Sequence, residues 1–297
     1  MKSMTIMIPF MNNLRFGMPM LGALKYMTSD EVEWLLMDNG STDKIEAYVR
    51  NYIKPKRLNF VRYETNQGLM NNIQTAYEMC QTDLLMFLHN DCFIYEKNWD
   101  VRIRRYFDEI PNLGMAGFFA AQGCLPDGGR LQDVERSGQM SGLSNMLEAD
   151  IHGIKLNQPW RSCAIYDSFS MIFNMEMLRK GNGFDTRYKF HHLFDRDCSL
   201  ESLRRGYKNI VVDVPCHHIG GITHETPQYQ SWLQGIIGSK FEDGRLHNEN
   251  AEKFKKKWAK LNALPLYVED DFSFRTGLLS LPTPLEYKGN NIVGAGL

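Results

Sequence analysis

The sequence has no long hydrophobic segment. In 297 residues the longest apolar runs are 84–88 and 115–121, far short of the roughly 20 residues that a membrane-spanning helix needs. The first residues also lack the basic region, apolar core and small-residue cleavage site of a signal peptide. We therefore expect both runs to be buried strands, no transmembrane segment, and a cytoplasmic protein.

Neither sign of charge is in excess, because 34 Lys and Arg face 35 Asp and Glu. That balance argues against a nucleic-acid-binding protein and against a polybasic membrane protein. The cysteines are scattered without a C-x-x-C pair, which predicts reduced thiols and not a disulfide framework or a zinc site. They are Cys80, Cys92, Cys124, Cys163, Cys198 and Cys216.

Short apolar segments alternate with helical patterns in the first half of the chain. Strands are predicted at 5–8, 34–37, 58–63 and 84–88, and an amphipathic helix at 69–80 separates the last two. This alternation predicts an α/β fold with a mainly parallel central sheet flanked by helices. Ligands of such sheets bind beyond the carboxyl ends of the strands.

The second half is less regular. Residues 123–153 are rich in Gly, Ser, Asp and Met and show no sustained period, so we expect a long loop that acts as a lid over the site. Strands are predicted at 166–173 and 210–214, and helices at 195–205 and 251–261.

Polar clusters follow two of the predicted strands. Asp38 begins the cluster that ends at Asp43, and His89, Asn90 and Asp91 follow the fourth strand. Such residues can simply form turns or cap helices. Alternatively, Asp91 can hold a divalent cation that neutralises a diphosphate leaving group, and Asp38 can accept a hydrogen bond from the edge of a base.

Two later clusters are equally open to interpretation. Asp195 and Asp197 stand near a helix start, where negative charge is favourable in any case, but either could deprotonate an acceptor hydroxyl as a general base. His217 and His218 precede Gly220 and are either polar surface or a source of one imidazole ligand beside a metal carboxylate. The sequence leaves open which histidine that is.

The order of these motifs resembles that of the large second family of inverting glycosyltransferases, which have the GT-A fold. The similar elements extend roughly over residues 4–260 and occur in the family's order. They are Ile6-Met7-Ile8-Pro9-Phe10, Asp38-Asn39-Gly40-Ser41-Thr42-Asp43, Asn66-Gln67-Gly68, His89-Asn90-Asp91, Gly183-Phe184-Asp185, Asp195-Arg196-Asp197 with Arg205-Gly206-Tyr207, and His218-Ile219-Gly220-Gly221-Ile222-Thr223. Asn248, Phe254 and Trp258 also resemble the family's C-terminal helix.

Four positions depart from the family pattern. His89 and Asn90 leave Asp91 as the one carboxylate in the metal motif. Phe194 replaces the usual Glu, and Glu201 occupies a position where the family often has Arg.

The resemblance implies a nucleotide-sugar donor (UDP-, GDP- or dTDP-linked) and a carbohydrate-type acceptor such as a glycan, a lipid-linked sugar or a protein. Asp91 would bind the Mn²⁺ or Mg²⁺ that bridges the donor diphosphate, with His218 as a late metal or phosphate ligand. Asp195 would be the base of a single in-line displacement with inversion. The residues implied to border the donor are Pro9, Phe10, Asp38, Asn66, Gly68 and Asn90.

The resemblance also implies a GT-A domain over residues 1–225, with a donor half at about 1–120 and an acceptor half at 121–225. A C-terminal helical extension and tail would occupy 226–297.

Two other functions remain to be separated from this one. A nucleotidyltransferase needs a Gly-rich loop with Arg and Lys after its first strand, whereas residues 9–16 contain only Arg15 and no Gly. A catalytically inactive module that binds nucleotide-sugars is the other alternative, because the departures at His89, Asn90 and Phe194 fall in the site and a fold does not imply a function.

Overall fold

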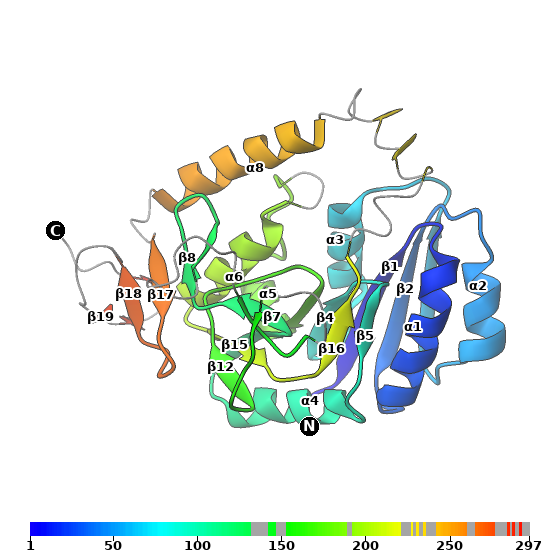
Figure 1. Cartoon of the computed structure of the whole chain (residues 1–297), viewed down its shortest axis with the longest axis horizontal. Coiled ribbons are helices and arrows are strands. Elements are labelled where there is room, and N and C mark those ends of the chain that lie inside the picture. The colour runs from blue at the N-terminus through cyan, green and yellow to red at the C-terminus, as the bar shows by residue number, and fades with distance from the viewer. Residues whose placement is uncertain are drawn as a thin grey trace.

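The computed structural model describes residues 1–131, 142–146, 153–188, 192–220, 242–259 and 265–276, together with scattered positions within 227–235 and 284–292. Its centre is an eight-stranded sheet with helices on both faces (Figure 1). In spatial order the strands are β12 (Trp160–Ser162), β15 (Lys208–Val212), β6 (Leu113–Gly117), β14 (Ser170–Asn174), β4 (Leu84–Leu88), β1 (Met4–Phe10), β2 (Glu33–Asn39) and β3 (Leu58–Tyr63).

The sheet is mainly parallel, as the sequence predicts. Strands β1, β2, β3 and β4 pair in parallel, and so do β6 and β15. Strand β14 runs antiparallel to both β4 and β6, and β12 runs antiparallel to β15 at the edge. Reversed β14 therefore joins the two parallel parts, and the carboxyl ends of β1, β2 and β4 lie on one side of the molecule.

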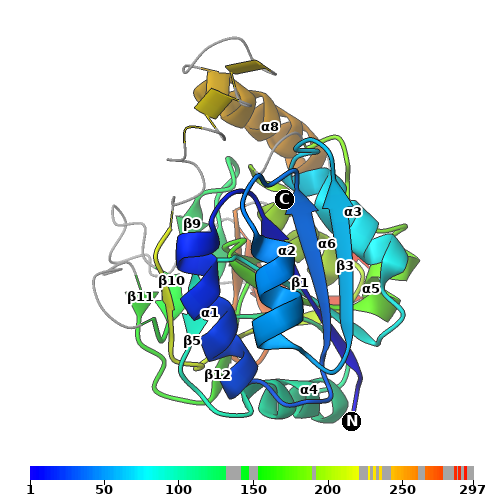
Figure 2. The same ribbon diagram turned by 90° about the vertical axis from the view of Figure 1, so that its right-hand side faces the viewer.

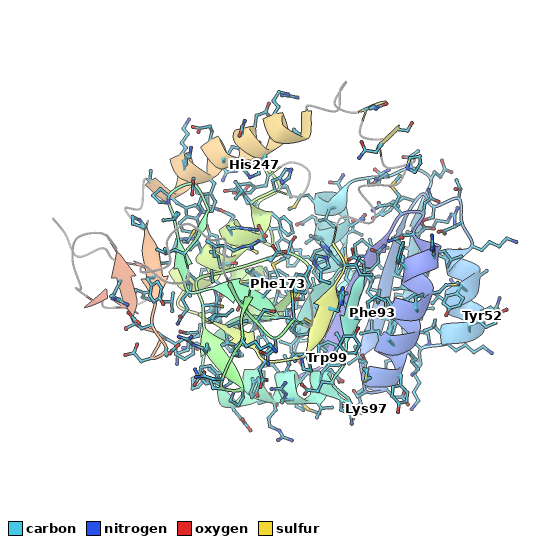
Figure 3. All side chains as sticks on the ribbon, in the orientation of Figure 1. Tyr52, Phe93, Lys97, Trp99, Phe173 and His247 are labelled. Atoms are coloured by element: carbon cyan, nitrogen blue, oxygen red, sulfur yellow. The ribbon has the colours of Figure 1, made fainter. Side chains whose placement is uncertain are left out.

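Alternate residues of the strands face two separate cores. On β1, Ile6 and Ile8 lie in one core and Met7 lies in the other, as the two-residue period of a strand requires. Figure 3 labels Trp99 and Phe173, one from each core. Burial on both faces explains why the central strands are continuous apolar runs.

The helices divide between these cores, and Figure 2 shows α1 and α2 on one face and α3 on the other. The first core, which contains Ile6 and Ile8, is covered by α1 (Leu14–Met27), α2 (Ile45–Tyr48), the π-helical turn η1 (Val49–Ile53) and α4 (Trp99–Glu109). The second core, which contains Met7, is covered by α3 (Leu69–Met79), α5 (Met175–Lys180), α6 (Phe194–Arg204) and α8 (Glu242–Ala259).

Smaller sheets surround the central one. Strands β11 (Gly153–Ile154), β10 (Gly142–Ser144), β7 (Phe119–Ala121) and β13 (Ile165–Tyr166) form one, and β5 (Cys92–Ile94) pairs with β16 (Cys216–His218). A further sheet contains β19 (Pro284–Leu285), β18 (Phe274–Thr276), β17 (Leu266–Val268), β8 (Gly123–Cys124) and β9 (Arg130–Leu131). Strands β20 (Tyr287–Lys288) and β21 (Asn291–Ile292) form a hairpin.

The sequence prediction is confirmed for the four early strands and the helices at 69–80 and 195–205, within two residues at most ends. Two predicted strands were wrong in extent. The run 115–121 is divided between β6 and β7, and the run 166–173 is divided between β13 and β14, which belong to different sheets. Continuous hydrophobicity marked burial correctly, but it could not show where the chain changes sheet.

The predicted loop at 123–153 is also partly regular, since β8, β9, β10 and β11 fall within it. Residues 132–141 and 147–152 lie outside the described part of the chain, and the lid remains a prediction. Beyond residue 225 the described residues include helix α8 and strand β17, which pairs with β8. The domain boundary itself stays a prediction. No helix in the described residues is long and apolar enough to cross a bilayer.

Candidate active site

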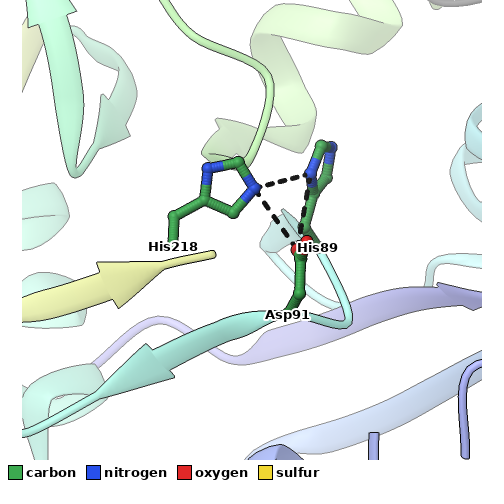
Figure 4. A group of neighbouring side chains, drawn as sticks. All are labelled: His89, Asp91 and His218. Atoms are coloured by element: carbon green, nitrogen blue, oxygen red, sulfur yellow. Dashed lines mark hydrogen bonds and ion pairs between the residues drawn. The ribbon is translucent and has the colours of Figure 1, made fainter. Parts of the chain in front are cut away.

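The site lies where β4 ends. His89 follows the last residue of β4, and Asp91 precedes β5 in the turn between the two strands. Strand β16 pairs antiparallel with β5 and sets Cys92 opposite His218. This short ladder carries His218 to Asp91, and the three side chains converge in Figure 4.

One ligand atom from each of these side chains lies within 4.8 Å of the others. His218 Nε2 is 3.2 Å from His89 Nδ1 and 3.3 Å from Asp91 Oδ1. His89 Nδ1 is 3.9 Å from the same carboxylate oxygen. Of the two histidines that the sequence left open, His218 belongs to this group; His217 does not.

Burial and the neighbouring side chains together determine the charges of Asp91 and His89. The Asp91 side chain is only 5% exposed; burial opposes its ionisation, but His218 and His89 outweigh burial and hold the pKa of Asp91 below its ordinary value. Burial and the neighbouring His218 lower the pKa of His89 to about 4. His89 is therefore neutral at pH 7, and a neutral imidazole can bind a metal ion.

Aromatic rings hold both imidazoles. The ring of Phe169 stacks on that of His218 with centroids 4.4 Å apart and an angle of 12°. Phe87 meets His89 edge to face at 5.3 Å. A backbone hydrogen bond of 2.9 Å from His89 N to Phe169 O joins the two segments.

Two arginines lie close to this group without being part of it. Arg130 pairs with Asp167, just before Phe169 in the chain. Burial opposes the ionisation of Asp167. The charges of Arg130, Arg196 and the two histidines outweigh burial, so the pKa of Asp167 lies below its ordinary value. Burial also lowers the pKa of Arg196 to about 10.

The carboxylates of Asp195 and Asp197 have different partners. The Asp195 side chain is 2% exposed and pairs with the Arg196 guanidinium, while Arg196 N donates a 2.9 Å hydrogen bond to it. Asp197 instead accepts hydrogen bonds from Tyr188 Oη at 3.0 Å, Trp258 Nε1 at 2.9 Å and Lys257 Nζ at 2.7 Å. Asp197 therefore fastens α8 to α6.

The departures from the family pattern have structural partners. Phe194 is buried in the second core, where it meets Phe87 edge to face at 6.4 Å. Glu201 accepts hydrogen bonds from Arg204 and lies 3.0 Å from Lys257. Where the family often has a cation, this chain has an acid, and its charge partners include Arg204 on the same helix and Lys257 on α8.

At the ends of the neighbouring strands, the residues expected to border the nucleotide-sugar lie in turns that are joined by hydrogen bonds. Asp38 is fully buried, and accepts hydrogen bonds from Ser41 N at 2.8 Å and Arg62 Nη1 at 3.0 Å. Asp43 accepts hydrogen bonds from Ile45 N and Leu14 N, so its capping interpretation is confirmed. The Asp38 carboxylate likewise supports a turn.

The 66–68 turn has a clear backbone requirement. Gly68 has φ +80°, and its N–H donates a 2.8 Å hydrogen bond to Asn66 Oδ1. A residue with a Cβ is strained in that conformation. Asn66 Nδ2 approaches Met11 Sδ at 2.9 Å, next to the end of β1 with Pro9 and buried Phe10. Asn90, in contrast, is buried within the metal-motif turn.

Sequence analysis did not identify His89, Asp167 or Arg130 as site residues. His89 was treated as the loss of a carboxylate, although histidine is itself a common metal ligand, and that was the signal available. Asp167 and Arg130 belong to no recognised motif, and only the fold brings them beside His89.

The overall fold is shared with known structures. TarS from S. aureus, in its 1–349 fragment, aligns at 13% identity over 82% of this chain and 68% of that one, with a TM-score of 0.53. The mannosyltransferase PcManGT from Pyrobaculum calidifontis, in complex with GDP-Man and Mn²⁺, aligns at 14% identity over 89% and 76%, with a TM-score of 0.53. GalNAc-T7 with UDP, GalNAc and Mn²⁺ aligns at 12% identity over 79% and 48%, with a TM-score of 0.56.

At these identities the likeness establishes the fold, which is that of a GT-A glycosyltransferase. The sequence profile of glycosyl transferase family 2 matches residues 5–181, more than half of the 297 residues. The chain belongs to this family and is a glycosyltransferase that uses a nucleotide-sugar. No curated protein matches the sequence.

Proposed function

We propose that the protein transfers a sugar from a UDP-, GDP- or dTDP-linked donor to a carbohydrate-type acceptor hydroxyl, with inversion and with Mn²⁺ or Mg²⁺. The observation that carries the metal requirement is the convergence of Asp91 and His218 at the carboxyl end of β4. Asp91 Oδ1 is buried, and the atoms that approach it are His218 Nε2 at 3.3 Å and His89 Nδ1 at 3.9 Å; neither forms a well-aligned hydrogen bond with it in the described part of the chain. A buried acceptor of this kind needs a cation or a donor, so the residues fit a metal ion.

When bound, the ion would neutralise the charge that develops on the diphosphate leaving group. The protein's own residues would bind the nucleoside. The turns that carry Asp38 and Asn66 flank the end of β1, and Gly68 would permit close approach of the backbone. Because Asp38 already holds Ser41 N and Arg62, a base would share its carboxylate with these groups.

We assign Asp195 as the general base. Both oxygens of its neighbour Asp197 already accept hydrogen bonds from Tyr188, Trp258 and Lys257, which gives Asp197 a structural role. An acceptor hydroxyl could reach Asp195 once it replaces the Arg196 guanidinium, and the released guanidinium could then approach the anionic donor. This exchange would activate the base only when the site is filled.

The neighbours bind UDP, UDP-GlcNAc and GDP-Man according to their names, which defines the first donor panel. Purified protein should release nucleoside diphosphate from one of these donors, and release should rise with acceptor and stop with EDTA. If a donor binds but is never turned over, the inactive binding module is the correct alternative. If a nucleoside triphosphate and a sugar phosphate yield pyrophosphate, the protein is a nucleotidyltransferase.

A further inference from the structure

The side chain at position 89 is a nitrogen base that points at the metal group. The family resemblance leads one to expect a carboxylate here, and the sequence therefore suggested a site weakened to one carboxylate. The structure places His89 Nδ1 against His218 Nε2 and Asp91 Oδ1 instead. The substitution changes the type of ligand and does not remove one.

The spacing of the three atoms suits one metal ion. Ligand atoms about 2.1 Å from an ion lie about 3.0 Å apart at adjacent octahedral positions and about 3.4 Å apart in a tetrahedron. The observed separations are 3.2, 3.3 and 3.9 Å. Small side-chain adjustments would bring all three into one coordination sphere, on one side of the ion.

The donor set decides which ions are favoured. Mg²⁺ prefers oxygen ligands and keeps several waters. Imidazole nitrogen binds first-row transition ions better, with affinity rising from Mn²⁺ through Fe²⁺ to Co²⁺. Two imidazoles with one carboxylate also hold only one negative charge, which weakens the electrostatic attraction on which Mg²⁺ depends.

We propose that His89 is a third metal ligand, with Asp91 and His218, and that this set of two nitrogens and one oxygen selects a first-row transition ion over Mg²⁺. The proposal rests on the proposed function for its use in sugar transfer, but the binding of the ion does not depend on turnover. Of the two ions in the proposed function, Mn²⁺ and Mg²⁺, this ligand set favours Mn²⁺, which is a transition metal.

The surroundings keep the ligands in place without an ion. Phe169 stacks on the His218 ring and Phe87 meets the His89 ring, so neither imidazole has to be ordered on binding. The β5–β16 ladder fixes His218 opposite Cys92. A preformed set of ligands loses less conformational entropy when it binds, which favours an ion that matches it.

The test is metal binding to the whole protein after chelation and dialysis, by isothermal titration calorimetry and thermal melting with Mg²⁺, Mn²⁺ and Co²⁺. We expect affinity to follow Co²⁺ > Mn²⁺ > Mg²⁺. His89→Ala should lose at least about 10- to 100-fold in Co²⁺ affinity, the range already found for changes outside the ligands themselves. His89→Asp should lose Co²⁺ affinity and gain Mg²⁺ affinity.

His217→Ala is the matched control, because His217 is adjacent to His218 on β16 and does not belong to the ligand group; its metal affinities should equal those of the wild type. The melting temperature without metal shows whether each variant is folded. Equal wild-type affinity for Mg²⁺ and Co²⁺, or unchanged Co²⁺ affinity in folded His89→Ala, overturns the proposal. If the wild type binds Co²⁺ through His89 but transfers no sugar, the proposed function fails while the metal assignment stands.

Discussion

Lys257 on α8 donates a 2.7 Å hydrogen bond to Asp197 on α6. Its ammonium also lies 3.0 Å from Glu201 and 3.3 Å from Asp185. One cation thus compensates three carboxylates, and α8 is bound to α6 through charge as well as through buried Trp258.

Replacing Lys257 with Met should therefore destabilise the protein by about 3 kcal/mol, because removing one partner of a buried pair leaves an uncompensated charge. Lys255 provides the control, since it is an exposed lysine on the same helix and Lys255→Met should change stability by less than about 0.5 kcal/mol. Urea denaturation gives both values. Equal midpoints for the two variants would contradict the role of Lys257.

Phe194→Glu restores the family's usual residue and should damage this protein. Phe194 is 2% exposed and packs against Phe87, so the change removes apolar contacts and buries a carboxyl group. A loss of at least about 3 kcal/mol is expected, and Phe194→Leu should lose less. Thermal melting of both variants is the measurement, and a Glu variant as stable as wild type would show that the site can relax around a charge.

Asp195→Asn should lower kcat by about 10²- to 10⁴-fold, the usual contribution of a general base, while donor affinity stays nearly unchanged. Asp197→Asn should act on stability, because Asp197 binds Lys257 and Trp258. Steady-state kinetics beside melting curves separate the two effects. Normal turnover of Asp195→Asn would remove the assigned base.

Asp38→Ala should raise the donor KM with little change in kcat, as expected when binding shared by ground and transition states is lost. It should also cost about 1–3 kcal/mol in stability, because Ser41 N loses its acceptor. Arg62→Ala keeps the Asp38 carboxylate and serves as the control. If both variants raise KM equally, the loop conformation and not a base contact is responsible.

Asp185 gives a prediction for pH. A hydrogen bond from Arg187, together with Lys257, lowers the pKa of Asp185 from 3.8 to about 2. A carboxyl group whose pKa is depressed by folding contributes stability above its unfolded pKa and loses it as pH falls toward the folded value. The urea midpoints of wild type and Asp185→Asn should therefore differ at pH 6 and converge as the pH falls from about 4 to about 2, the interval between the unfolded and folded pKa of Asp185. A constant difference across that range would exclude this pairing.

Sequence reasoning succeeded where one segment carried its own pattern. The β4 run 84–88 is apolar on both faces because both faces are buried, and the polar residues after it had to lie at a strand end. It failed where distant segments meet. Nothing near Glu201 in sequence reveals Lys257 as its partner, and as isolated residues Asp43, which accepts hydrogen bonds at a helix start, and Asp91, the proposed metal ligand, look equally polar.

The meaning of His89 was lost for the same reason. Its value as a ligand depends on His218, which lies 129 residues away. Comparison of His89 with the carboxylate that the family has at this position showed only that a carboxylate is missing. The β5–β16 pairing that brings the two together involves three-residue strands, too short to give a periodic signal in the sequence.

This β5–β16 pairing has a consequence for the order of folding. Closing so long a loop costs entropy that local contacts do not repay, so the ladder should form late, after the central sheet. A nascent chain that ends near residue 200 carries His89 and Asp91 but not His218, and cannot complete the ion's coordination. Only a chain whose intervening segments have already folded could therefore bind the ion with all three side chains. Chelation of the metal during refolding should slow the last kinetic phase but not the first.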